Sequence, residues 1–417
     1  MQVVSDQVYG TIDLHACSWQ IINTPEYQRL SNIKQLGAAS FVFPSANTTR
    51  LEHCIGVSHL ARKLGTRFQH TQPELGITDN DLLCLELAGL CHDLGHGPYS
   101  HAYEAFCKDK GAHFHHESMS CKILNLIIQK YSLEPVLLSS GIGSDEIHRI
   151  CEMIYGSKDD APDDWEWRGA PKGKEFLYEI VSNKRTGLDV DRFDYFQRDS
   201  ERTGVKICFD LGRLLTMSHV WEIKGENIIC YSVKAKQCVA DAYETRFRLH
   251  KCIYSHKTIR AVELWIFEIF NKARPWFLEN LGVELEKAWE NVELFATLDD
   301  TIFSAIAHLT SGTTDLKLTI HNLSRRQIWK VREQRYFDKE EEAQVFIQKL
   351  EETFKGDCNH VIDVVTVHHG NGTRDPMERV VFYSEKDRFS NHFIQVCPPY
   401  QLWIVRLFGM PHDLAKF

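Results

Sequence analysis

The sequence predicts a mainly α-helical protein with a small α+β lobe at its C-terminal end. Through roughly the first 335 residues, apolar side chains recur near the helical period, as at Leu51, Ile55 and Leu60. Beyond them come short β-branched or aromatic runs separated by Gly and Pro, a pattern typical of strands, at 361–367, 380–383 and 402–408. We therefore expect a helical core over residues 1–335 and an α+β lobe over residues 336–417.

Helix boundaries can be predicted in the core. Thr78 followed by Asp81 forms a capping signal before a leucine-rich run, and the GHGP stretch at 95–98 ends that helix. Further expected elements are an amphipathic helix over 116–131, two helical pieces hinged near Gly187 over 175–199, one long helix over 240–271, and an exposed loop over 157–174.

Composition narrows the class of protein. The chain is 43% hydrophobic and 25% charged, as folded globular proteins are. It has no uninterrupted apolar run long enough for a membrane span, and its first residues do not resemble a secretory signal. We expect no membrane association.

Cysteine usage indicates the cellular compartment, and net charge indicates the partners. The 13 Cys are scattered without a C-x-x-C pair, which favours reduced thiols in a cytoplasmic or nuclear compartment. The net charge of −9 predicts weak nucleic-acid binding or none, because that affinity comes mainly from neutralising phosphates.

The residues that indicate chemistry are centred on CHDLGHG at 91–97. His92 and Asp93 end an apolar helix just before a glycine break, and imidazole with carboxylate is a mixed ligand set for a divalent metal ion. Taken alone, this dipeptide is weak evidence for a metal site, because a polar helix end usually explains such a pair.

Two further segments strengthen the metal hypothesis. Upstream, His53 stands at the start of an amphipathic helix. Downstream, Asp191, Tyr195 and Asp199 are spaced i, i+4, i+8 and share one helix face. Such a polar face fits a cleft, and it also fits a solvated surface.

The order His53, His92-Asp93, Asp191 resembles that of the HD phosphohydrolase superfamily. The chain closely resembles the catalytic core of the animal SAM-and-HD-domain dNTP triphosphohydrolases, whose N-terminal SAM domain has no match here. The matching segments are 24–30, 33–37, 88–98 and 176–185. The match covers residues 1 to about 260 well and the remainder weakly. It implies that residues 1–335 are an HD-domain catalytic core with regulatory nucleotide-site elements.

The resemblance implies a role for each matching position. A divalent metal (Fe, Zn, Mn or Mg) would be held by His53, His92, Asp93 and Asp191. The catalytic residues would be Asp93, His96, His101 and His116, one of the histidines transferring a proton to the leaving sugar oxygen. The substrate would be bound by Gln35, Leu36, Arg50, Arg192, Tyr195, Asp199, Arg246, His250 and Tyr254. Arg192 stands where the family has Lys, which keeps the charge but not the shape.

The implied reaction is hydrolysis of a dNTP to a deoxynucleoside and tripolyphosphate, with a second Mg²⁺ at the phosphates as a further expected ligand. Leu36 and Tyr254 would exclude the 2′-hydroxyl of ribose, while Gln35 and Asp199 would bind the 3′-hydroxyl. The sequence itself offers a basic stripe, Arg246 and His250 before Tyr254, which fits a polyphosphate cradle as well as an exposed helix face.

Regulation is where the chain departs from the family, which assembles through nucleotide-binding allosteric sites. Gln2, Asn23 and Ser31 replace Lys, Asp and Arg, and the lost Asp and Arg are the guanine-reading pair. Ser5, Ser232 and Glu385 are also altered. We expect changed activation by an activating nucleotide and a homo-oligomer, dimer or tetramer. The retained allosteric positions are Val3, Val42, Phe43, Arg213, Lys234, His256, Lys257, Arg326 and Lys330.

Two alternatives remain open at this level. The protein could be an HD hydrolase of another nucleotide, which product analysis distinguishes, since only the triphosphohydrolase releases tripolyphosphate. It could also be a non-catalytic nucleotide sensor or a single-stranded nucleic-acid binder, against which the complete ligand set and the acidic charge argue.

Overall fold

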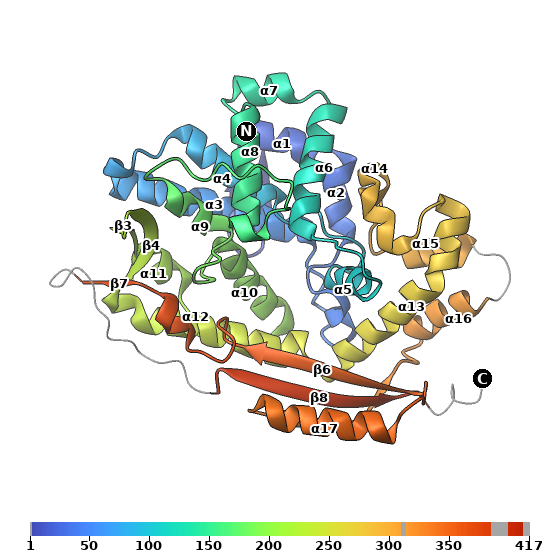
Figure 1. The fold of residues 1–417 in the computed structure, drawn as a ribbon. Helices are drawn as coiled ribbons and strands as arrows, with labels where there is room; N and C mark the ends of the chain where they lie inside the picture. Colours follow the sequence, from blue (N-terminus) through green and yellow to red (C-terminus); the bar gives the residue numbers. More distant parts are fainter. Residues whose placement is uncertain (1, 310–313, 385–398, 412–417) are drawn as a thin grey trace.

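A computed structural model describes residues 2–309, 314–384 and 399–411 of the protein. Its centre is the helix pair α3 (Arg50–Thr71) and α4 (Asp79–Cys91), around which the helical body is arranged (Figure 1). Gly89 faces the backbone of Ser58, and Gly65 faces Leu82, so the two helices run antiparallel and very close. Thr78 and Asp81 form the expected capping box at the start of α4.

The remaining helices of the body are α1 (Ala16–Ile22), α2 (Pro25–Gln28), α5 (His101–Asp109), α6 (His116–Lys130), α7 (Glu134–Ser139), α8 (Ser144–Tyr155), α9 (Tyr178–Val181), α10 (Val190–Thr203), α11 (Leu211–Thr216), α12 (Lys236–Leu249), α13 (Lys257–Leu281), α14 (Val292–Phe295), α15 (Ile302–Leu309) and α16 (Asp315–Ser324). They pack around this central pair or, from α13 to α16, lie to one side of it (Figure 1). The predicted helix over 116–131, the hinge at Gly187 between α9 and α10, and the mainly irregular segment 157–174 are confirmed.

The single long helix expected over 240–271 is wrong. α12 ends at Leu249 and is followed by a π-helical turn, His250–Tyr254, in which the Ser255 amide bonds the His250 carbonyl at 2.8 Å. The His256 side chain then accepts the Thr258 amide at 3.2 Å and starts α13 as a new helix. A side chain thus takes over a hydrogen bond that the backbone would make in a continuous helix.

The C-terminal lobe is a sheet in the order β5-β8-β6, covered on one side by α17 (Glu340–Thr353). Its antiparallel strands are β5 (Lys330–Phe337), β6 (His360–His368) and β8 (Gln401–Gly409). Figure 1 shows β6 on the side of β8 that faces the helical body. The expected strands at 361–367, 380–383 and 402–408 are confirmed, the middle one as the short β7 (Phe382–Tyr383).

Two strand pairs inside the expected helical core were not predicted. One is the hairpin of β1 (Val3–Asp6) and β2 (Gly10–Asp13), and the other is the hairpin of β3 (Ser218–Ile223) and β4 (Glu226–Ser232), which β7 joins in parallel. The division of the chain between residues 335 and 336 stays a prediction, and this position lies within β5.

Candidate metal and nucleotide site

Three elements bring together the four predicted metal ligands. His53 comes from α3, His92 and Asp93 follow α4, and Asp191 lies in the first turn of α10. His53 Nε2 is 3.3 Å from His92 Nε2 and 3.0 Å from Asp191 Oδ1, and His92 Nε2 is 3.5 Å from Asp93 Oδ1. The three residues His53, His92 and Asp93 form a buried group whose ligand atoms could hold one ion.

The other ring nitrogen of each histidine has its own partner. His92 Nδ1 lies 2.8 Å from the Gly89 carbonyl oxygen and His53 Nδ1 lies 2.7 Å from a carboxylate oxygen of Asp194. A carbonyl can only accept, so Nδ1 of His92 carries the proton and Nε2 is left as a lone-pair donor. This arrangement is typical of metal-binding histidines.

The charges around this group favour the binding of a cation. Burial opposes a charge on His53, yet Asp191 and Asp194 raise its pKa to about 10. At Asp191 burial would raise the carboxyl pKa, but His53 and His92 hold it well below its usual range. Carboxylates that favour positive charge on their neighbours this strongly fit a divalent ion.

Asp93 also binds the guanidinium of Arg50, which is almost fully buried. Arg50 Nε donates to Ser100 Oγ at 2.9 Å, and Ser100 and its neighbour Tyr99 both have positive φ, 54° and 57°. Non-glycine residues in this region are strained, and such strain is common at functional sites. The turn is held by Asp300, whose carboxylate accepts the Tyr99 amide at 2.6 Å.

The three predicted catalytic histidines form one cluster. The rings of His96 and His116 are stacked with centroids 4.1 Å apart, and His101 packs edge-on to His96 at 5.2 Å. Burial, Arg50 and His116 keep the pKa of His96 well below its usual range. Burial opposes charge on His116 too, but Glu104 raises its pKa, so the pKa values of the two stacked histidines are shifted in opposite directions.

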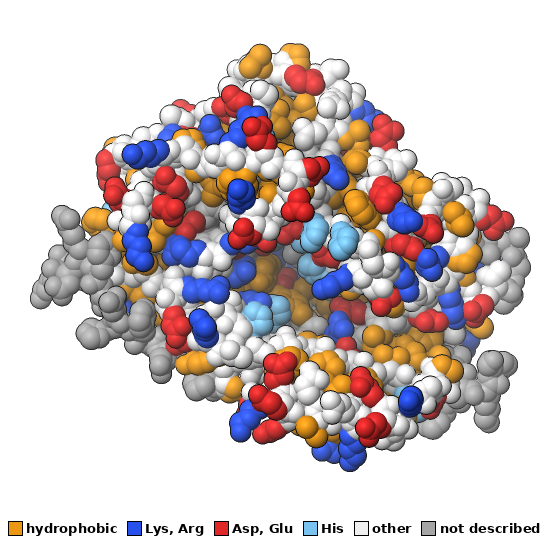
Figure 2. Space-filling model, in the orientation of Figure 1, with side chains coloured by type: hydrophobic (Ala, Val, Ile, Leu, Met, Phe, Trp, Pro, Cys, Tyr) orange, Lys and Arg blue, Asp and Glu red, His pale blue; other side chains and the backbone are white. Residues whose placement is uncertain are grey.

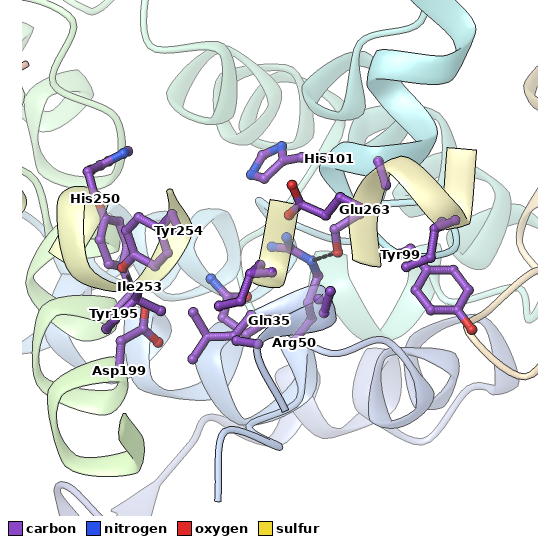
Figure 3. A pocket seen from close by; sticks show the side chains of 18 residues that line it. Gln35, Arg50, Tyr99, His101, Tyr195, Asp199, His250, Ile253, Tyr254 and Glu263 are labelled. Carbon is purple, nitrogen blue, oxygen red and sulfur yellow. Dashed lines mark hydrogen bonds between the residues drawn. The ribbon is translucent and has the colours of Figure 1, made fainter. Parts of the chain in front are cut away.

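A cavity of about 240 Å³ opens beside this cluster. It reaches from Arg50 and His101 to Tyr254 and Asp199 (Figure 3). Tyr254 donates to one Asp199 oxygen at 2.6 Å, while Asp199 Oδ1 and Gln35 Oε1 are buried with no hydrogen-bond partner among the described residues. Predicted residues in the lining are Gln35, Leu36, Arg50, His101, Tyr195, Asp199, His250 and Tyr254.

A second, smaller cavity of about 120 Å³ lies against the metal ligands. His92, Asp93 and Asp191 line it together with His116 and Arg192. Lys184 also lines it, and the sequence reasoning did not single this residue out, although it lies within the matched segment 176–185. Figure 2 shows histidine and cationic side chains gathered around a hollow at the centre of this face.

Arg246 lies outside the linings of both cavities. Its guanidinium donates to the carbonyl of His368, which comes from β6 of the C-terminal lobe. Burial, Arg246 and Arg192 lower the pKa of His368 to about 4, so this histidine belongs to the same cationic surroundings. Sequence reasoning missed His368, because no local pattern links the end of a strand to α12.

Comparison with known proteins identifies the family. A model of the HD domain matches residues 50–166. The chain is 36% identical over 93% of its length to the deoxynucleoside triphosphate triphosphohydrolase SAMHD1 of Gallus gallus, covering 67% of that protein. It is 33% identical to the Bos taurus protein of the same name, again over 93% of the chain, and covers 70% of it. The chain belongs to the SAMHD1 family.

A relative from outside the vertebrates agrees with this result. The SAMHD1 homolog of Dictyostelium discoideum is 36% identical over 79% of this chain and 59% of its own length. The resemblance found in the sequence and the mainly helical HD-domain fold class are therefore confirmed. This SAMHD1-family chain spans about two thirds of the length of the vertebrate relatives.

The predicted regulatory positions of this SAMHD1-family chain lie outside the linings of the two cavities. The rings of Phe43 and His256 have centroids 6.3 Å apart, and Arg326 donates to the Phe41 carbonyl at 2.7 Å. Arg213 donates to the Lys234 carbonyl at 2.9 Å. Their allosteric roles stay predictions, as do those of Val3, Val42, Lys257 and Lys330, and Glu385 lies outside the described residues.

Within the described residues, we find no helix with the length and apolar character needed to cross a membrane.

Proposed function

We propose that the chain hydrolyses deoxynucleoside triphosphates to deoxynucleosides and tripolyphosphate. The observation that carries the proposal is the group of His53, His92, Asp93 and Asp191, the first three of them buried, which Arg50 joins to a nucleoside-sized cavity with unpaired acceptors. The names of the relatives state the same activity for those proteins.

The proposed metal site comprises His53, His92, Asp93 and Asp191. Each histidine turns Nε2 towards the group while Nδ1 is taken by Gly89 or Asp194, so the donor set fits a divalent ion. When bound, the ion would polarise a phosphate oxygen and lower the pKa of water. The same N/O set accepts Fe, Zn, Mn or Mg, so the identity of the metal is left to measurement.

In this proposal the deoxyribose lies at the Asp199 end of the larger cavity. A 3′-hydroxyl would donate its one hydrogen to the buried Asp199 Oδ1 or Gln35 Oε1, which removes the cost of leaving that acceptor unpaired. Leu36 and Tyr254 line the same space and would pack where a 2′-hydroxyl needs room.

The phosphates would extend over the smaller cavity, where Arg192, Lys184 and His116 meet. Arg50 sits between the two cavities, binding Asp93 and lining the larger one, so it would contact the α-phosphate. Arg246, His250 and Tyr195 complete the phosphate-binding set, and a second Mg²⁺ would suit Asp93, His96 and His116, the other group of potential ligands. Fixed cations offset the charge that develops on the phosphates during hydrolysis.

We assign proton transfer to His101. It lines the nucleoside cavity next to Arg50, where the leaving sugar oxygen would lie, and its Nδ1 is 3.4 Å from Glu104. An imidazole with a carboxylate on its far nitrogen can protonate a leaving group at neutral pH. His96 and His116 lie on the metal side of the cluster and would bind phosphate oxygens.

Product analysis tests the proposal. The protein is incubated with Mn²⁺ or Mg²⁺ and each dNTP, with and without GTP, and products are resolved by chromatography. We expect deoxynucleoside and tripolyphosphate, lost in Asp93→Asn and kept in Asp145→Asn, the same change at a side chain that is 78% exposed. Metal-loaded protein that yields monophosphates or no product would refute the proposal.

We further propose that the enzyme is a homo-oligomer with altered nucleotide activation. Asn23 and Ser31, which replace the family's guanine-reading pair, are both exposed on the described surface. Neither side chain carries a charge, so recognition of guanine at this position would be weak.

A further inference from the structure

The larger cavity has a polar side chain that the proposed function leaves without a role. Glu263 lies on α13, between Ile259 and Ile266, and all three line the cavity. Their spacing puts them on one face of the helix. In Figure 3 the carboxylate end of Glu263 lies on the side of the cavity that holds His101.

The walls around Glu263 suit a flat aromatic ring. Ile259 and Ile266 form one side, and Leu36, Ala38 and Ala39 line the cavity as well. In the proposed substrate pose the sugar takes the Asp199 end, so the base falls among these apolar side chains. Burying a base between apolar surfaces is favourable, but its polar edge then needs a partner.

Glu263 is held in place from one side only. Its Oε2 pairs with Arg260, whose guanidinium donates to Asp363 of β6 at 2.7 Å. Asp363 is 4% exposed and also accepts from the buried Arg406 at 3.3 Å, which fixes Arg260 against the sheet. No hydrogen-bond donor contacts Glu263 Oε1 within the part of the chain that the structure describes.

A carboxylate in this setting can only accept hydrogen bonds. Partial burial raises the pKa of Glu263, whose side chain is 30% exposed. Guanine presents two adjacent N–H donors on its pairing edge, and cytosine and adenine each present an amino group there. Thymine presents a single N–H flanked by two carbonyl oxygens, which a carboxylate repels.

We propose that Glu263 reads the edge of the nucleobase and makes the enzyme favour guanine, with cytosine and adenine next and thymine least. The inference rests on the proposed function, since it takes the deoxynucleotide as the occupant of the cavity. It assigns to the C-terminal lobe a part in substrate choice, because Asp363 positions Arg260 and Arg260 positions Glu263.

The test compares dGTP with dTTP in the wild type and in Glu263→Gln, with the same GTP concentration in every reaction. A glutamine keeps the size and both donates and accepts, so the preference for dGTP in kcat/KM should fall about tenfold, as expected for loss of a bidentate base contact. Glu268→Gln makes the same change on α13 at a side chain that is 40% exposed, and should leave the preference unchanged.

A binding measurement separates the inference from the proposed function. Calorimetric titration with deoxyguanosine and thymidine needs no turnover and avoids triphosphate-dependent regulatory sites. Tighter binding of deoxyguanosine, lost in Glu263→Gln, would support the inference even if no dNTP were hydrolysed. Equal binding of both nucleosides, or a preference that Glu263→Gln leaves intact, would overturn it whatever the enzyme hydrolyses.

Discussion

Asp194 and Asp191, one turn apart on α10, hold the two nitrogens of the same imidazole. Asp194 Oδ2 is 2.7 Å from His53 Nδ1, and Asp191 Oδ1 is 3.0 Å from His53 Nε2. Asp194 is fully buried and also accepts from Arg198 Nε at 2.8 Å, so its position is fixed from two sides. One helix thus supplies both a proposed metal ligand and the residue that orients another.

This relationship predicts that Asp194→Asn weakens metal binding. An amide no longer stabilises the imidazole through a charged acceptor, and loss of such a partner costs about 10- to 100-fold in metal affinity. Competition with a chelator, followed by elemental analysis, measures the change. Asp145→Asn should retain wild-type affinity, and an Asp194→Asn protein that melts normally and binds metal as tightly would contradict the prediction.

Asp199 should make stability depend on pH. Burial raises its pKa from 3.8 to about 7, so the folded state holds the proton more tightly than the unfolded chain. Ionising Asp199 therefore destabilises the fold progressively as pH rises from 3.8 to about 7, and by a constant amount above that.

Asp199→Asn removes this cost and keeps an acceptor for Tyr254. The melting temperature of the variant relative to the wild type should therefore increase between about pH 4 and pH 7 and then level off. Thermal melts in matched buffers measure it. A difference that stays constant over the whole range would show that Asp199 titrates normally.

Gly95 should tolerate no side chain. A Cβ there would lie 2.1 Å from the His116 carbonyl oxygen and 2.4 Å from the Ser120 amide nitrogen, so α6 would have to move away from the HD turn. We expect Gly95→Ala to destabilise the protein by about 3 kcal/mol in urea unfolding, the upper part of the range for overpacking. Gly212→Ala, whose Cβ meets only Asp210 Oδ1 at 3.4 Å, is the control and should change stability little.

Activation by GTP should be weak or unselective. If Asn23 and Ser31 have lost guanine recognition, dNTP hydrolysis with GTP should resemble that with ATP at equal concentration. The double variant Asn23→Asp with Ser31→Arg should restore a preference for GTP, and both positions are exposed enough to accept the change. Strict dependence of the wild type on GTP would refute the altered-activation proposal.

The sequence determined much of this protein because several of its signals are local. Capping at Thr78, the helical period of α3 and the glycine turn after Asp93 depend on neighbouring residues, and all three are present in the structure. The order of His53, His92, Asp93 and Asp191 predicted a ligand set for the same reason, since each sits in a recognisable motif, and the structure brings the four residues together. The family resemblance added expected roles in substrate binding and proton transfer, which residue spacing alone does not indicate.

Only the tertiary structure decided the contacts between distant segments. The π-helical turn at His250–Tyr254 and the cap at His256 interrupt a stretch whose sequence reads as one helix, because side-chain hydrogen bonds there outweigh propensity. The sequence did not show that Asp194 is the partner of His53, or that Glu263 lines a cavity and is linked to Asp363 through Arg260. A polar residue in a helical sequence gives the same pattern whether its side chain faces water or a cavity. Its surroundings are set by packing across the fold, and packing is not encoded in any short stretch of the chain.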